Sequence, residues 1–274
     1  PYLTADHRLM LEKAEEILVG IKILMHALHV SRAIIGIENN KKDAIDLFRK
    51  LVPRDVGIQI AALRVKYPQG GEKQLVRALL KREVPKNGLP LDVGVVVHNV
   101  GTVFAIYQAV QHNRPLIERV VTVTGKKLEN PSNFWVRIGT PISDLLAEVG
   151  GVPENTRKIV SGGPMMGKAL KNTDVPVTKG TSGILVIPGE EANRGTPRNC
   201  IRCGECVDVC PMGLEPHLLM NLTEKTMFEK AAQEDILTCI ECGSCSYVCP
   251  SHRPLLDYIR FGKTMAKQLE SNQG

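Results

Sequence analysis

Aromatic residues are scarce in this sequence, and the chain has no long uninterrupted apolar run. Phe, Tyr and Trp together make up 4% of the 274 residues. Proteins that bind single-stranded nucleic acid stack bases on aromatic side chains, so this scarcity argues against a nucleic-acid partner. The longest stretch without acidic or basic residues, 93–113, includes His98, Asn99 and His112. A bilayer-spanning helix needs about twenty predominantly apolar residues, so we expect any membrane association to be peripheral.

The net charge of +6 is unevenly distributed along the chain. Residues 1–197 carry 27 basic and 19 acidic groups, whereas residues 198–274 carry 8 and 10. The basic excess of the first part suits an anionic partner, such as a nucleotide or an anionic membrane surface, and it equally suits a solvated face.

Cysteine is absent outside two short runs that share one spacing. The run CIRCGECVDVCP at 200–211 spaces four cysteines as C-x2-C-x2-C-x3-C before a proline, and CIECGSCSYVCP at 239–250 repeats the pattern. This spacing is typical of proteins with two [4Fe–4S] clusters. Zinc sites usually pair C-x2-C knuckles across a longer gap. Disulfides need an oxidising compartment, and the sequence shows no signal peptide. The pattern therefore predicts two [4Fe–4S] clusters.

The fourth cysteine of each run is expected to bind the cluster of the other run, as in two-cluster ferredoxins of this spacing. The predicted ligands of one cluster are Cys200, Cys203, Cys206 and Cys249. The predicted ligands of the second are Cys239, Cys242, Cys245 and Cys210. The short gaps allow three consecutive thiolates to surround one cubane, and a glycine in each run gives the backbone room to turn.

The rest of the sequence divides into a long region of alternating strands and helices and a shorter region rich in glycine and proline. The strands predicted in the long region are 32–38, 56–64, 92–99 and 117–125. Continuous apolar strands separated by helices indicate an α/β domain with a parallel sheet covered on both faces. Short strands around one helix then predict a small β-grasp-like α+β module, followed by a helical ferredoxin-like region that holds both clusters. The predicted domains are 1–128, 129–195 and 196–274.

Five motifs along nearly the whole chain carry a family resemblance. They are PYLTADHRLM, YPQGGEKQL, VVHNVGTVFAIYQAV, GGPMMG and the paired cysteine runs. In this order they resemble the C subunit of the Rnf electron-transport complex, a family that is similar to the flavin-carrying, NADH-oxidising subunit of respiratory complex I. The resemblance implies a flavin- and nucleotide-binding domain, a soluble-ligand-binding β-grasp domain and then iron–sulfur helices. It also implies FMN as a cofactor and NADH as the substrate.

The resemblance implies flavin and nicotinamide contacts at two places. The relatives' N-N-V-E-T contacts the flavin, and its match HNVGT makes Asn99 and Thr102 candidate flavin contacts. The relatives' AYICGEETAL aligns with KYPQGGEKQL, which implies Tyr67 beside the flavin and Glu72 near the nicotinamide as the candidate catalytic residue. Asn99 equally suits the cap of the following helix, and Glu72 equally suits a first-turn acid favoured by the helix dipole.

The resemblance further implies an electron-entry subunit of an ion-translocating oxidoreductase. It would pass electrons between NADH, through FMN, and the two clusters; a flavin is needed because NADH delivers a hydride whereas clusters accept single electrons. The implied partners are the membrane and iron–sulfur subunits of the same complex, with peripheral association at the cytoplasmic face of the bacterial inner membrane. A flavin-free electron-transfer module, a cobalamin reductase of the same domain order and a zinc-binding interaction protein remain alternatives.

A glycine-rich motif of the relatives is missing from the sequence. They carry a flavin and nucleotide loop upstream of the stretch that matches Pro1, whereas G-x-G-x-x-G occurs nowhere in this chain. We therefore expect the chain to be a fragment of a longer polypeptide. We also expect it to oxidise NADH poorly, because a phosphate cradle needs a glycine-rich backbone at a helix N-terminus.

Overall fold

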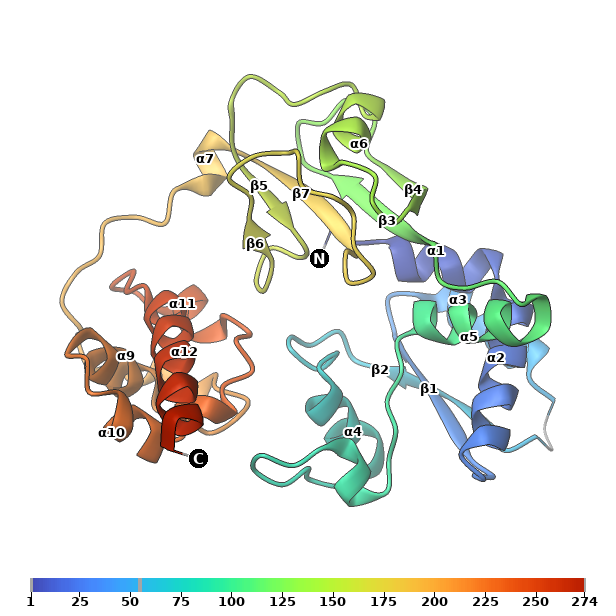
Figure 1. The fold of residues 1–274 in the computed structure, drawn as a ribbon, viewed down its shortest axis with the longest axis horizontal. Coiled ribbons are helices and arrows are strands. Elements are labelled where there is room, and N and C mark those ends of the chain that lie inside the picture. The colour runs from blue at the N-terminus through green and yellow to red at the C-terminus, as the bar shows by residue number, and fades with distance from the viewer. Residues whose placement is uncertain (1, 54–55, 274) are drawn as a thin grey trace. The chain divides into compact units, whose positions relative to one another are not determined.

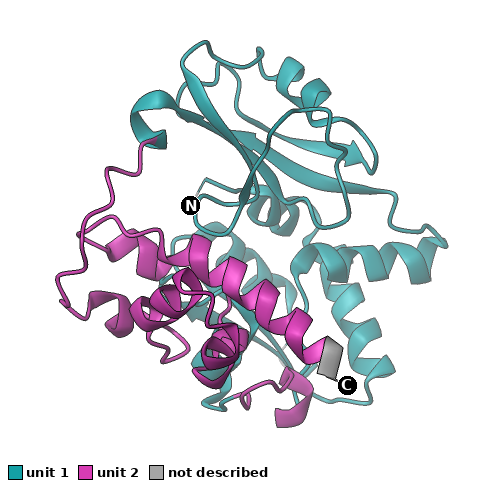
Figure 2. Ribbon diagram, turned by 60° about the vertical axis from the view of Figure 1, so that its left-hand side comes forward, with its two compact units in different colours: residues 1–83, 94–192 teal, residues 84–93, 193–274 magenta. Residues whose placement is uncertain are grey.

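The computed structural model describes residues 2–53 and 56–273 (Figure 1). The chain forms two compact units, which Figure 2 shows in different colours. The first unit comprises the residues up to 83 together with 94–192, and the second comprises 84–93 and the chain from 193 onward. The candidate flavin contacts lie in the first unit and both cysteine runs in the second. Within the described ranges, no helix has the length and apolar character that crossing a membrane requires.

The first unit begins with five helices and a two-stranded parallel sheet. The helices are α1 (Ala5–Glu12), α2 (Ala14–Ala27), α3 (Lys42–Leu51), α4 (Glu72–Leu80) and α5 (Val100–His112). Strands β1 (Ala33–Glu38) and β2 (Ile58–Leu63) pair in parallel. Apolar helix residues pack against this sheet, and Ile17, Ile37 and Phe48 are almost fully buried. Burial of each such side chain stabilises the fold by about 1.5–3 kcal/mol. Helices α1 and α5 pack against this core.

The strands predicted at 32–38 and 56–64 are confirmed as β1 and β2, but the strand predicted at 92–99 is wrong. Pro90–Val93 forms the 3-10 helix η1, and no strand occurs in the described stretch 94–99. Val96 is 45% exposed there. An apolar pattern indicates that side chains avoid water. A strand also needs an adjacent strand to pair with its backbone N–H and C=O groups, and the pattern gives no information about that strand. The covered four-stranded parallel sheet is therefore not formed.

A five-stranded mixed sheet completes the first unit (Figure 1). Its strands are β3 (Glu118–Thr124), β4 (Ser132–Arg137), β5 (Thr156–Ser161), β6 (Lys168–Ala169) and β7 (Gly183–Pro188), in the order β4-β3-β7-β5-β6. Strand β3 runs antiparallel to β4 and parallel to β7. Helix α6 (Ile142–Glu148) packs its Ile142 into a core with Val121 and Ile184. The short helix α7 (Gly189–Ala192) ends the unit.

The strand predicted at 117–125 forms as β3, but in this mixed sheet rather than in a sheet with β1 and β2. The predicted domain boundary at residue 128 therefore falls in the connection between β3 and β4, two strands that pair with each other. The beginning of the chain is attached to the same sheet, because the backbone N–H groups of Thr4 and Ala5 donate to Thr122 Oγ1 at 3.1 and 2.9 Å. These bonds hold the start of α1 beside β3.

The second unit is helical. Besides η1, its elements are α8 (Glu205–Asp208), α9 (Pro216–Glu224), α10 (Phe228–Gln233), the 3-10 helix η2 (Ile236–Thr238), α11 (Ser244–Val248) and α12 (Leu255–Gln273). Leu219, Ile236 and Ile259 form the centre of its apolar core, and several cysteines pack against this core. An ion pair between Lys86 and Asp235 attaches the segment 84–93 to the unit. The thiols thus lie in and around a helical core.

Candidate iron–sulfur centre and flavin contacts

The two cysteine runs fold into the same local shape. Arg202 and Glu241, the third residue of each run, both have a φ of +57°, and Gly204 and Gly243 have φ values of +82° and +81°. Two left-handed residues in so short a segment turn the backbone sharply between consecutive cysteines, and glycine adopts this conformation without a steric penalty. A short helix, α8 or α11, then carries the third cysteine.

Backbone N–H groups donate hydrogen bonds to thiols in both runs. The backbone N–H of Arg202 donates to Cys200 Sγ, that of Glu241 to Cys239 Sγ and that of Leu214 to Cys210 Sγ. The nitrogen–sulfur distance is 3.4 Å in each case. A hydrogen bond to sulfur favours the thiolate form, and such bonds are among the determinants of cluster potential. The backbone of both runs is therefore arranged to support thiolate ligands.

The fourth cysteine of the first run lies with the second run. One cavity is lined by the four thiols Cys210, Cys239, Cys242 and Cys245. Apolar side chains, among them Leu219 and Ile259, complete its wall. In the described part of the chain, no three Cys, His, Asp or Glu side chains converge on a point that would hold a single metal ion. Four thiols around an apolar-walled cavity fit the ligand set of a cubane cluster.

The fourth cysteine of the second run lies with the first run. Burial raises the pKa of the Cys206 thiol, and the charges of three neighbouring thiols raise it further. These neighbours are Cys249, Cys200 and Cys203. A hydrogen bond from the backbone of His217 acts in the opposite direction and lowers this pKa. These neighbours place Cys249 beside the first run, as the crossed assignment requires, and the two ligand sets stay a prediction.

The two sets differ in their exposure to water. Cys200 and Cys203 are exposed, whereas Cys242 and Cys245 are 7% and 9% exposed. Burial, with a further contribution from the charge of Cys239, raises the pKa of the Cys245 thiol to about 12. Iron binds the thiolate, so cluster binding at Cys245 must release the proton of a thiol with a raised pKa.

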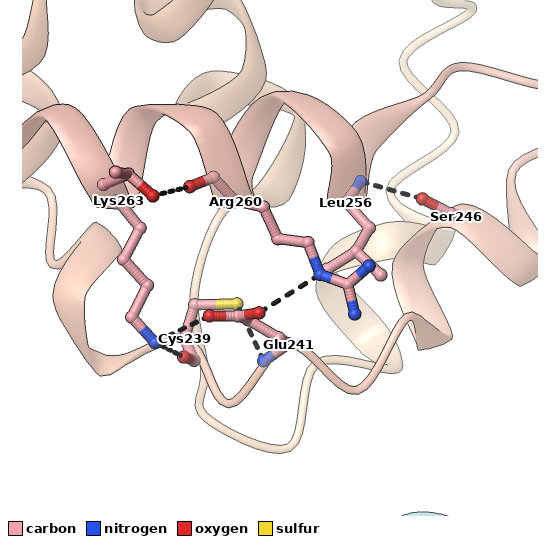
Figure 3. Close-up of polar contacts among 7 residues, drawn as sticks. Cys239, Glu241, Ser246, Leu256, Arg260 and Lys263 are labelled. Carbon is pink, nitrogen blue, oxygen red and sulfur yellow. Dashed lines mark hydrogen bonds and ion pairs between the residues drawn. The ribbon is translucent and has the colours of Figure 1, made fainter. Parts of the chain in front are cut away.

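Two cations of α12 that the sequence analysis did not single out lie close to the buried set. Lys263 Nζ donates to the carbonyl oxygen of Cys239 at 2.5 Å and lies 3.3 Å from Glu241 Oε1. Arg260 Nε lies 3.1 Å from Glu241 Oε2. Figure 3 shows both side chains reaching from the helix toward Glu241. The only signal in the sequence is a pair of cations at i, i+3 spacing, which many solvated helices share.

Asn99 and Thr102 lie at the start of α5. The side-chain oxygen of Asn99 accepts a hydrogen bond of 2.8 Å from the backbone N–H of Gly101, so Asn99 caps the helix, as one of the two interpretations expected. Thr102 is exposed in the first turn. The N-terminus of a helix is suited to an anionic group such as a flavin phosphate, so the position fits FMN, and the flavin role of these two residues stays a prediction.

Tyr67 and Glu72 lie at the start of a different helix, α4. Glu72 is its first residue and is exposed, and Gly71 occupies the N-cap position. Tyr67 precedes the helix and is 42% exposed. An acid in the first turn is favoured by the helix dipole, so this position has a structural explanation beside the catalytic one. The four candidates therefore form two pairs at two helix starts, and their roles stay predictions.

Comparison with known proteins assigns a family to each part of the chain. Residues 1–108 match the Nuo51 FMN-binding domain, residues 120–169 the SLBB domain and residues 192–250 the 4Fe-4S dicluster domain. The chain is 48% identical over 265 residues to the C subunit of the proton-translocating ferredoxin:NAD(+) oxidoreductase complex of Clostridium ljungdahlii. It is 46% identical over 263 residues to the C subunit of the Na(+)-translocating complex of Acetobacterium woodii. Over nearly its whole length the chain is therefore similar to the C subunits of ion-translocating oxidoreductase complexes.

The curated relatives are longer than this chain. The two alignments cover 96% of this chain, but 58% of the Clostridium ljungdahlii protein and 59% of the Acetobacterium woodii protein. The C subunit of the ion-translocating oxidoreductase complex of Yersinia pseudotuberculosis is 46% identical over 271 residues, which are 98% of this chain and 39% of that protein. The chain thus spans about half the length of its curated relatives.

The fold also occurs in solved structures. NAD+-reducing [NiFe]-hydrogenase in its H2-reduced state aligns with a TM-score of 0.61 at 16% identity, over 98% of this chain and 54% of that one. The air-oxidized state aligns with the same TM-score at 14% identity, over 97% and 58%. These likenesses show a shared fold.

The family resemblance and the predicted cofactor classes are confirmed by these comparisons. The chain carries an FMN-binding domain and a 4Fe-4S dicluster domain. The match to the dicluster domain includes all eight cysteines.

Proposed function

We propose that this chain passes electrons between NADH, through FMN, and two [4Fe–4S] clusters, as the electron-entry part of an ion-translocating oxidoreductase. The observation that carries the proposal is the grouping of eight cysteines into two sets of four, inside the segment that matches the 4Fe-4S dicluster domain. FMN supplies the conversion of a hydride into single electrons when it is bound. The relatives named as ferredoxin:NAD(+) oxidoreductase subunits support NADH and NAD+ as the two-electron couple.

Each set of thiols has a defined task in this proposal. One cluster is held by Cys200, Cys203, Cys206 and Cys249. The other is held by Cys210, Cys239, Cys242 and Cys245, whose apolar cavity limits the access of water. Exposure differs between the sets, and exposure is one of the factors that set a cluster potential, so we expect the two clusters to titrate separately.

The flavin and nicotinamide contacts are assigned to the two helix starts. Asn99 has one amide hydrogen and one oxygen lone pair beyond its two observed hydrogen bonds, and Thr102 offers an exposed hydroxyl at the same helix start. Tyr67 would lie against the flavin, and Glu72 near the nicotinamide. A flavin-free electron-transfer module is the second candidate, because the hydrogen bonds of Asn99 already account for its presence at the cap.

The domain order is part of the proposal. A flavin-binding domain precedes a β-grasp-like domain, which the mixed sheet around α6 supports, and a helical ferredoxin-like domain follows. The pairing of β3 with β4 supports a first boundary before Glu118 rather than at residue 128. We further propose that membrane and iron–sulfur subunits of the same complex are the partners, and that the chain associates peripherally with the cytoplasmic face of the bacterial inner membrane.

Cofactor analysis of the reconstituted chain tests this function. Iron, acid-labile sulfide and FMN are quantified on one sample, and the reduction of the clusters by NADH is then followed by absorbance and EPR. Iron and sulfide for two clusters are expected, with NADH-dependent reduction that requires FMN and is slow because the chain has no glycine-rich phosphate loop. Zinc without iron and sulfide would contradict the proposal. Cluster reduction that does not require FMN would favour the flavin-free module, and reduction of an added cobalamin would favour a cobalamin reductase.

A further inference from the structure

The two cysteine runs carry opposite charges at one matched position. Arg202 and Glu241 occupy the same place in their runs, have the same φ of +57° and donate the same backbone hydrogen bond to the cysteine two residues earlier. The backbone at this place is therefore held against a cysteine in both runs. Reduction of a cluster adds one negative charge, so a lone carboxylate beside the second site would disfavour reduction there.

Glu241 is not a lone carboxylate, because two cations of α12 approach it. Its Oε2 lies 3.1 Å from Arg260 Nε, and its Oε1 lies 3.3 Å from Lys263 Nζ (Figure 3). The Lys263 side chain is 16% exposed, the least exposed of the three. Charges in such a partly buried place are screened less by salt and water than charges on the surface. The group as a whole carries one negative and two positive charges.

Lys263 also touches the ligand backbone itself. Its ammonium donates to the carbonyl oxygen of Cys239, a thiol that lines the second cavity. The ammonium therefore stabilises negative charge on this ligand, which is also the charge that a reduced cluster places on its sulfurs.

We propose that Lys263, held by the carbonyl of Cys239 and paired with Glu241, is a positioning residue that raises the reduction potential of the cluster bound by Cys210, Cys239, Cys242 and Cys245. Arg260 contributes by neutralising the carboxylate. In the step concerned, the bound cluster takes up one electron from FMN or from a chemical titrant, and Lys263 acts through its charge and its hydrogen bond to Cys239. The proposal rests on the cluster ligands proposed above.

A redox titration of the full chain with both clusters, followed by EPR, tests the role of Lys263. Lys263→Gln keeps a hydrogen-bond donor and removes the charge. We expect it to lower the ratio of reduced to oxidised cluster at the second site about tenfold at a fixed potential, which is about 59 mV for a one-electron couple. The other cluster keeps its potential. Lys263→Arg restores the charge and should restore the potential.

Glu241→Gln supplies a change of opposite sign. It removes the carboxylate but leaves the backbone hydrogen bond to Cys239, so the potential of the second cluster should rise. A role in packing alone predicts no such pair of opposite shifts. Lys267→Gln is the matched control, because Lys267 is an exposed cation one turn further along α12, and its loss should move neither potential.

Iron, sulfide and melting temperature are measured on the same samples. Full iron content in Lys263→Gln with both potentials unchanged would overturn the proposal, and so would equal shifts from Lys263→Gln and Lys267→Gln. If Lys263→Gln loses iron, Glu241→Gln decides: a raised potential of one cluster supports the proposal, and an unchanged one overturns it. Absence of iron from the unmodified chain would instead refute the proposed function.

Discussion

The amide nitrogen Nδ2 of Asn99 donates a hydrogen bond of 2.8 Å to Oδ2 of Asp6. Oδ1 of the same side chain accepts a hydrogen bond of 2.8 Å from the backbone of Gly101. One side chain therefore both caps α5 and connects it to α1, two helices that are far apart in the sequence. The PYLTADHRLM motif and the HNVGT motif meet at this residue. Any flavin contact at Asn99 would be made by a side chain that these two bonds already orient.

Replacement of Asn99 separates its cap from a flavin contact. Asn99→Ala should lower the free energy of unfolding by about 1 kcal/mol, because the cap is lost. Asn99→Ser retains a cap acceptor but loses the amide, so its stability should stay within a few tenths of a kcal/mol of the original chain. If Asn99 also contacts FMN, both variants should retain less FMN while their iron content is unchanged. Full FMN occupancy in both variants would show that Asn99 acts only as the cap of α5.

The local part of this architecture could be predicted from the sequence, whereas its long-range part could not. The cysteine spacing predicts the shape of each run because the turns at Arg202 and Glu241 lie within a few residues of their ligands. The strand predicted at 92–99 was wrong because the apolar pattern contains no information about which strand would lie beside it. Lys263 could not be found for the same reason: its contact with Cys239 spans 24 residues. Helical packing, rather than spacing, creates that contact.

Replacement of the fourth cysteine of each run by alanine tests whether the two clusters share ligands in the crossed arrangement. Cys249→Ala should damage the cluster at Cys200, Cys203 and Cys206, and Cys210→Ala should damage the buried one, because each run needs the other's last thiol. EPR of the two separately reduced clusters identifies which signal is lost in each variant. Loss of the signal of the same run in either variant would show that the ligands are not crossed.

Removal of the clusters should unfold the second unit. Thiols of both runs pack against its core, and the binding energy of a structural metal site is folding energy. In a domain of this size each 1 kcal/mol lost lowers the melting temperature by about 4–8 °C, so the change is readily measured. Circular dichroism melts of the full chain, before and after anaerobic chelation, provide the comparison. Two identical melting profiles would contradict this dependence.

The contact between α12 and α9 depends on a glycine. A Cβ atom at Gly262 would lie 2.1 Å from Thr223 Oγ1 and 2.8 Å from Ile236 Cδ1. Alanine is the better helix former by about 1 kcal/mol, and overpacking costs about 1–3 kcal/mol. Thr223 and Ile236 are almost fully buried and cannot move away from a new methyl group. The cost of overpacking should therefore exceed the gain in helix propensity. We expect Gly262→Ala to lower the melting temperature of the second unit.

A double-mutant cycle with Thr223 assigns this loss to the helix contact. Thr223→Ala removes the hydroxyl that the new methyl group would meet, and this buried Oγ1 has no hydrogen-bond partner in the described structure. Gly262→Ala should therefore be less destabilising in the Thr223→Ala background, with a coupling energy above about 0.5 kcal/mol. Relief should be partial, because Ile236 keeps its position in both backgrounds. Thr264→Ala, on an exposed part of α12, is the control and should change stability by less than about 0.5 kcal/mol. Additive effects of the two buried substitutions would show that the close approach of α12 to α9 does not limit the residue at position 262.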